Sequence, residues 1–265
     1  MCENYILLEG VVPINRVFLI PSLFVLLFSI SQIATAEDAA KHEIEQALSK
    51  EANLDNGKKV FETCSLCHSP EGWGSTIGRF PQIAGQHKSV IIKQLADIRA
   101  GNRDNPTMFP FTQANILKDA QTIEDVAAYI SKLPMTRSNG KGSGLDLALG
   151  EQIFKKHCTT CHGASGEGDE EEFYPRIQGQ HYLYIFRQLR WIKSGKRRNA
   201  DPKMAKLIHN YSLRELSAVS DYVSRLSPPD ELLAKPGWKN PDFNPNLLNA
   251  QKVQRDLQSV DQAKK

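Results

Sequence analysis

The stretches Cys64-Ser65-Leu66-Cys67-His68 and Cys158-Thr159-Thr160-Cys161-His162 decide the fold of this chain, because they repeat one pattern, Cys-x-x-Cys-His. This pattern is typical of covalent c-type haem attachment, in which two thiols bind one porphyrin and the next histidine binds its iron. A redox dithiol or half of a zinc site would not require that histidine. The predicted thioether residues are Cys64, Cys67, Cys158 and Cys161, and the predicted iron ligands are His68 and His162.

Residues 1–36 have the pattern of an export signal. Arg16 is followed by an apolar run over residues 17–30 and by Ala34-Thr35-Ala36, an A-x-A cleavage site before Glu37. Cleavage would also remove Cys2, the fifth cysteine. An uncleaved anchor is the alternative, because about 20 residues can span a bilayer, although polar residues dilute this run. We expect a periplasmic protein, membrane-associated only if residues 17–36 are retained.

The composition excludes few partners. The formal net charge is +3 at pH 7, and no pattern supports nucleic-acid binding. One basic cluster stands out, and we interpret it as a solvated face with ion pairs to haem propionates, with a docking patch as the alternative. Its members are Lys193, Lys196, Arg197, Arg198, Lys203 and Lys206.

The chain contains an internal repeat with an offset of 94 residues, which places Gly85-Gln86-His87 against Gly179-Gln180-His181. A glycine precedes a phenylalanine by one helical turn before each motif, and a tyrosine-containing helical pattern closes each repeat. Two domains of this size need a covalent haem to supply much of their core. The predicted division is a polar N-terminal extension at 37–53, domains at 54–137 and 149–228, a linker at 138–148 and a proline-rich, polar tail at 229–265.

Over residues 54–227 the chain resembles class I cytochromes c, and its tandem arrangement is similar to the dihaem cytochrome c4 family. The resemblance implies an all-α fold of two tandem domains, each a small helical bundle around one haem, with its first and last helices crossing. The residues expected to pack at the two crossings are Gly57, Phe61, Tyr129, Gly150, Phe154 and Tyr222.

The sixth ligand of each iron decides between an electron carrier and a possible catalyst. Met108 and Met204 lie before each closing helix at matching places, so we predict methionine ligation at both irons. Met135 follows the first closing helix and is assigned to the linker or to packing. His87 and His181 are the alternative ligands, otherwise expected in local packing or exposed to solvent.

In class I cytochromes c, a proline carbonyl in the loop after the motif accepts a hydrogen bond from the axial histidine. Pro81 and Pro175 match that position here. The resemblance therefore predicts both carbonyls within hydrogen-bonding distance of the Nδ1 atoms of His68 and His162.

These features predict an electron carrier that exchanges electrons with redox proteins, including respiratory complexes. One alternative is an electron-accepting subunit of a periplasmic dehydrogenase, docked through residues 229–265. The other is a catalytic dihaem enzyme, such as a peroxidase or a thiosulfate-oxidising enzyme, which would need an open or exchangeable ligand at one iron.

Overall fold

A computed structural model describes residues 37–243 of the chain, and within this range it is helical and contains no β-strand. The predicted export signal at 1–36 and the end of the tail lie outside the described residues. The helices are α2 (Leu54–His68), α3 (Lys88–Arg99), α4 (Phe109–Thr112), α5 (Ala120–Ser131), α6 (Leu147–His157), α7 (Thr159–His162), α8 (Tyr182–Lys193), α9 (Pro202–His209) and α10 (Leu213–Ser224). A further helix covers residues 37–48, and a short 3-10 turn, η1, covers Asp230–Leu232. None of the helices in 37–243 has both the length and the hydrophobicity to span a bilayer.

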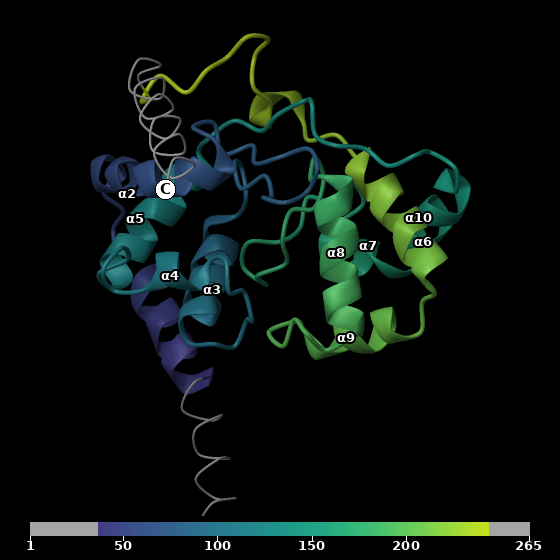
Figure 1. Cartoon of the computed structure of the whole chain (residues 1–265), viewed down its shortest axis with the longest axis horizontal. Coiled ribbons are helices and arrows are strands. Elements are labelled where there is room, and N and C mark those ends of the chain that lie inside the picture. Colours follow the sequence, from purple (N-terminus) through teal and green to yellow (C-terminus); the bar gives the residue numbers. More distant parts are fainter. Residues whose placement is uncertain (1–36, 244–265) are drawn as a thin grey trace, which may run out of the picture.

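The first domain, on the left of Figure 1, is held by the crossing of its first and last helices, α2 and α5. Gly57 makes this crossing possible, because a Cβ atom there would overlap the backbone carbonyl of Asp125. One turn later Phe61, fully buried, packs on Tyr129 with 5.3 Å between ring centroids. The packing predicted for these residues is confirmed.

The second domain repeats this crossing with α6 and α10. A Cβ atom at Gly150 would overlap the carbonyl of Ala218, and the Phe154 and Tyr222 rings lie 5.6 Å apart. Both crossings therefore use a glycine for close backbone approach and an aromatic pair for packing, as the repeat predicts.

The two domains face each other through hydrogen bonds that are exchanged symmetrically. Gln86 accepts from the Arg176 amide (2.9 Å) and donates to the Arg176 carbonyl (2.9 Å). Its counterpart Gln180 does the same to the Gln82 amide (3.0 Å) and carbonyl (2.8 Å). Because each glutamine satisfies two backbone groups of the opposite domain, the interface fixes the two domains relative to each other.

His87 and His181 belong to the same interface. His87 donates from Nε2 to the carbonyl of Glu167 (2.7 Å), and His181 donates from Nε2 to the carbonyl of Trp73 (2.7 Å). The Nδ1 atom of His181 accepts from the Gly140 amide. The expectation of local packing or solvent exposure was therefore wrong, because each histidine reaches the backbone of the opposite domain.

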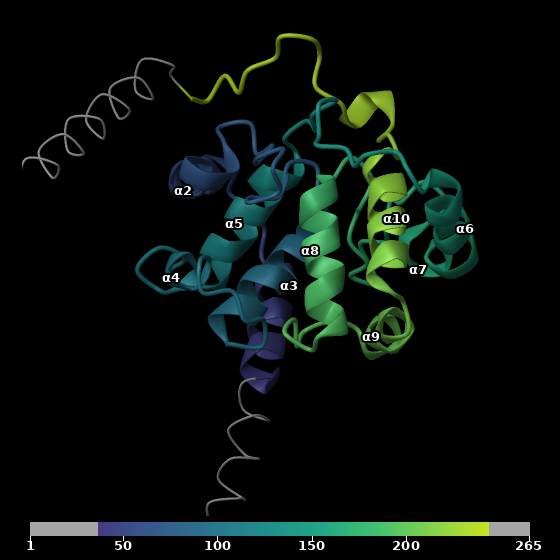
Figure 2. The ribbon, with the colours of Figure 1, turned by 45° about the vertical axis from the view of Figure 1, so that its right-hand side comes forward.

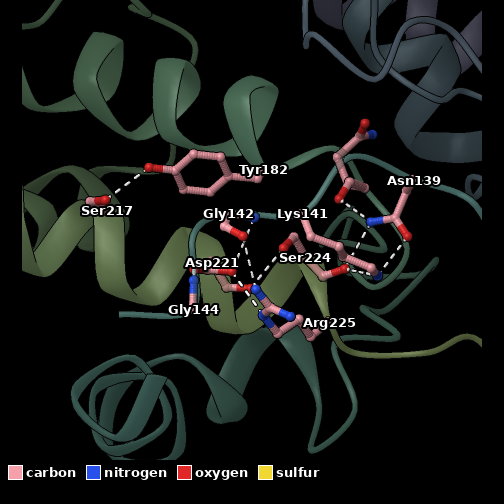
Figure 3. Close-up of polar contacts among 10 residues, drawn as sticks. Asn139, Lys141, Gly142, Gly144, Tyr182, Ser217, Asp221, Ser224 and Arg225 are labelled. Atoms are coloured by element: carbon pink, nitrogen blue, oxygen red, sulfur yellow. Dashed lines mark hydrogen bonds and ion pairs between the residues drawn. The ribbon is translucent and has the colours of Figure 1, made fainter. Parts of the chain in front are cut away.

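The predicted linker lies along α10, as Figure 3 shows. The amides of Gly142 and Gly144 both donate to the Asp221 carboxylate, at 3.1 and 2.6 Å, and Arg225 pairs with the same carboxylate at 2.9 Å. Asn139 donates to the carbonyls of Gln180 and Ser224. These contacts fix the glycine-rich connection to the second domain.

The described part of the tail returns to the first domain, crossing above both domains in Figure 2. The Tyr129 hydroxyl donates to Asp242 (2.9 Å), and Asn240 donates to the Pro70 carbonyl (2.7 Å). Phe243 packs edge-on against Phe61 at 5.8 Å. Residues 229–243, the first part of the segment considered for docking a partner subunit, thus cover the first domain of their own chain.

Candidate haem sites

The first motif lies in the last two turns of α2. Asn53 caps the start of this helix by accepting from the Asn56 amide, and the helix ends at His68, after which Ser69 has a positive φ of 66°. One unbroken helix therefore carries Cys64, Cys67 and His68 on neighbouring turns.

The second motif is built from two helical pieces. Three residues lie between Phe154 and Cys158, whereas two lie between Phe61 and Cys64. The helix ends at His157, Cys158 has a φ of −108°, and α7 then carries Cys161 and His162. The extra residue is accommodated by this break, which brings the second thiol and the histidine back into the register of the first domain.

Both motif histidines are buried and oriented by a proline carbonyl. His68 Nδ1 donates to the Pro81 carbonyl at 3.0 Å, and His162 Nδ1 donates to the Pro175 carbonyl at 3.1 Å. Burial lowers the pKa of both imidazoles, with the proline hydrogen bond opposing it. Each ring is thus neutral at pH 7 and keeps Nε2 for a metal ion.

The motifs open onto one cavity of about 1970 Å³ that runs through both domains. All four motif cysteines line this cavity, and burial raises the pKa of Cys64 to about 12 and of Cys158 to about 11. Met108 and Met204, one from each domain, line the same cavity as the two motifs.

The competing ligand candidates lie elsewhere. Met135 is 3% exposed and packs next to Gly85 and Gly179 at the domain interface, outside the cavity lining. His181 uses both ring nitrogens in hydrogen bonds, and His87 uses Nε2. The geometry therefore favours the two methionines over these residues.

Two arginines line the cavity and meet at the domain interface, and the sequence did not identify them as a pair. Arg103 donates to Gln94 (2.8 Å) and across the interface to Gln188 (3.2 Å). Arg197 donates to Gln188 (3.0 Å) and back to Gln94 (3.2 Å). The matching Gln and Arg positions in both repeats were the available signal.

These arginines suit the anionic propionates of a haem. Both line the cavity, and burial, together with the nearby Arg103 cation, lowers the pKa of Arg197 to about 9. Desolvated cations of this kind gain from an anion nearby. With four thiols at haem spacing and two oriented imidazoles, the residues present fit two c-type haems.

The basic cluster predicted around residues 193–206 does not form one face. Arg197 lies in the interface, and Arg198 donates to the Gly101 carbonyl of the first domain (2.6 Å). Lys196 lies over the Trp191 ring. Lys203 and Lys206 are left exposed on α9.

Comparison with known proteins agrees with this geometry. The Cytochrome c family model matches residues 54–134 and again 147–227. A cytochrome c4 of Pseudomonas aeruginosa is 31% identical over 180 residues, which cover 64% of this chain and 87% of the relative. The chain belongs to the cytochrome c4 family. Its two domains, each with one motif, imply two covalently bound c-type haems, and it is an electron-transfer dihaem cytochrome.

Two further relatives extend the comparison. The crystal structure of reduced recombinant cytochrome c4 from Pseudomonas stutzeri is 27% identical, covers 66% of this chain and all of that chain, and superposes with a TM-score of 0.59. A thiosulfate dehydrogenase electron acceptor of Stutzerimonas stutzeri is 31% identical over 199 residues, covering 68% of this chain and 90% of the relative. The chain is thus similar both to proteins named cytochrome c4 and to one named a thiosulfate dehydrogenase electron acceptor.

Proposed function

We propose that this cytochrome c4 is a periplasmic electron carrier in which His68 and Met108 ligate one iron and His162 and Met204 the other. The observation that supports the proposal is that both buried, carbonyl-oriented histidines and both methionines line the same cavity, with one histidine and one methionine contributed by each domain. A bound haem would supply one-electron redox chemistry, and a methionine as its second protein ligand would raise its potential.

The protein's own residues favour a carrier because they fix the positions of the predicted iron ligands. The Pro81 and Pro175 carbonyls fix the imidazole rings, and the helix crossings at Gly57 and Gly150 fix the motif helices. A site that moves little between oxidation states suits electron transfer, whereas catalysis needs an open or exchangeable position.

An electron-accepting role beside a dehydrogenase is a second candidate, because one relative is named a thiosulfate dehydrogenase electron acceptor. In this case the chain would receive electrons and would not oxidise thiosulfate itself. The docking role considered for residues 229–265 would have to be compatible with residues 229–243 covering the first domain.

The experiment is a pair of assays on the purified holoprotein. A carrier should be oxidised by respiratory membranes of its source organism, followed at the haem α-band, and should give no ferricyanide reduction with thiosulfate alone. Thiosulfate-dependent ferricyanide reduction by the holoprotein alone would contradict the proposal and favour a catalytic enzyme.

A further inference from the structure

The helix at residues 37–48 lies against the first-domain part of the cavity. Six of its residues line that cavity together with Cys64, Cys67 and Met108. Their spacing of three and four residues places them on one helical face. They are Glu37, Ala40, Lys41, Ile44, Glu45 and Leu48.

This helix is packed onto the first domain. Ala40 is 2% exposed and Ala47 is fully buried, in the same core cluster as Phe61. Glu43 forms an ion pair with Arg99 at the end of α3. Arg99 also donates to the carbonyl of Thr112 (2.6 Å), at the end of α4, which follows Met108.

The second domain has no matching cover within residues 37–243. The segment before α6 is tied to Asp221 of α10, and none of residues 138–152 lines the cavity. Instead, His157 and Lys203 line it, and Lys156 and Lys206 are exposed close by in sequence. We call these four residues the basic rim.

We propose that helix 37–48 closes the first haem site to partner proteins. Electrons therefore enter and leave through the second domain. There the basic rim binds a redox protein that has an acidic docking surface. This inference rests on the proposed carrier function. A helix with its side chains is about 10 Å across, so a partner on its outer face is held that much further from the first site. Attraction between the basic rim and an acidic partner surface also raises the association rate constant.

The test measures reduction of the holoprotein by the anionic iron(II)–EDTA complex in stopped flow. In the full chain, Lys203→Glu with Lys206→Glu should lower the second-order rate constant by roughly tenfold at low ionic strength, and added salt should shrink the loss. The matched control, Lys132→Glu with Lys235→Glu, places the same charges on the first domain and should change the rate by less than about twofold.

Deletion of residues 37–50 should open a second entry point. In the deletion variant, Lys203→Glu with Lys206→Glu should lower the second-order rate constant by no more than about twofold, because the first site now accepts electrons directly. An equal loss with and without the helix would overturn the proposal, as would an unchanged rate in the full chain.

The deletion removes buried Ala47 and could unfold the domain, so a second measurement uses the unaltered holoprotein. Amide hydrogens of residues 41–48 should be protected from exchange by a packed cover. Exchange as fast as in a free peptide would overturn the proposal. Failure of the carrier function itself would be seen separately, as carbon monoxide binding by the untreated holoprotein.

Discussion

In the first domain α2 runs unbroken through Cys64 and His68, whereas in the second domain the helix ends at His157 and α7 carries the rest of the motif. The proline hydrogen bonds to the two histidines nevertheless differ by only 0.1 Å, at 3.0 and 3.1 Å. A one-residue insertion is thus absorbed in the backbone before it reaches the iron-binding side chain. The proline–histidine hydrogen bond is therefore the same in both repeats, although the backbone before the second motif differs.

The domains differ more in what surrounds them. The first is covered by helix 37–48 and by residues 229–243, which add Ala47, Trp238 and Phe243 to its core. Within residues 37–243, the core cluster of the second domain is formed by its own residues, and the linker lies along α10. The two sites are similar in geometry, but segments outside the repeat cover and stabilise the first domain more than the second.

The largest expected effect comes from removing one haem at a time. Cys64→Ser with Cys67→Ser, and separately Cys158→Ser with Cys161→Ser, should each leave one haem per chain. The second pair of substitutions should cause the larger loss of helical content. Without its haem, the first domain is still stabilised by helix 37–48 and the tail, whereas the second domain has no such support within residues 37–243. Pyridine haemochrome content and far-ultraviolet circular dichroism measure both, and equal helix loss would contradict the difference in support.

The next effect isolates the tail. Trp238→Ala with Phe243→Ala should destabilise the first domain by about 2–4 kcal/mol, since both rings pack on its core but are only partly buried. Hydrogen exchange should accelerate in α2 and α5 and stay unchanged in α6 and α10. Leu145→Ala, at a side chain 86% exposed, is the control. Acceleration in both domains would show that the tail does not support the first domain alone.

A smaller effect tests the symmetry of the interface. Gln86→Ala and Gln180→Ala each leave a backbone amide and a carbonyl of the opposite domain without their partner. Each should cost about 1–3 kcal/mol, and the two costs should agree. Urea denaturation of both variants measures this, and a cost confined to one of them would break the symmetry.

The smallest effect is acid sensitivity of the tail. The Lys58 ammonium and the Tyr129 hydroxyl bind Asp242 and lower its pKa, against burial, which raises it. Stabilisation by this carboxylate is therefore full above its ordinary pKa of about 3.9 and is lost as the pH falls through the lowered value. Asp242→Asn should destabilise the protein at pH 6 and make little difference near pH 2. A difference that persists in acid would assign the effect to packing.

The sequence was sufficient wherever a feature is local or repeated. The motifs depend on spacing within one domain, and the resemblance to class I cytochromes c implied the roles of the glycines at the helix crossings and of the proline carbonyls. The exchange between Gln86 and Arg176 could not be found in this way, because it depends on how two folded domains meet. The repeated Gly-Gln-His triplet marked the residues without showing their partners.

The two covering segments were harder to predict. Helix 37–48 buries only small residues such as Ala40 and Ala47, so its sequence is mostly polar. Residues 229–243 of the tail show no helical or strand period, and the surface that they contact is formed by Phe61, Pro70 and Tyr129, which are far apart in sequence. Neither contact produces a periodic pattern within one segment of the sequence, so neither could be predicted from the sequence.

The most direct test of the account is the optical spectrum of the purified holoprotein, ferric and then ferrous, before and after addition of carbon monoxide. The account predicts two low-spin haems with the methionine-to-ferric-iron charge-transfer band and no carbon monoxide binding at either. Carbon monoxide binding at one haem of the native protein would contradict it, because Met108 or Met204 would then not hold its iron.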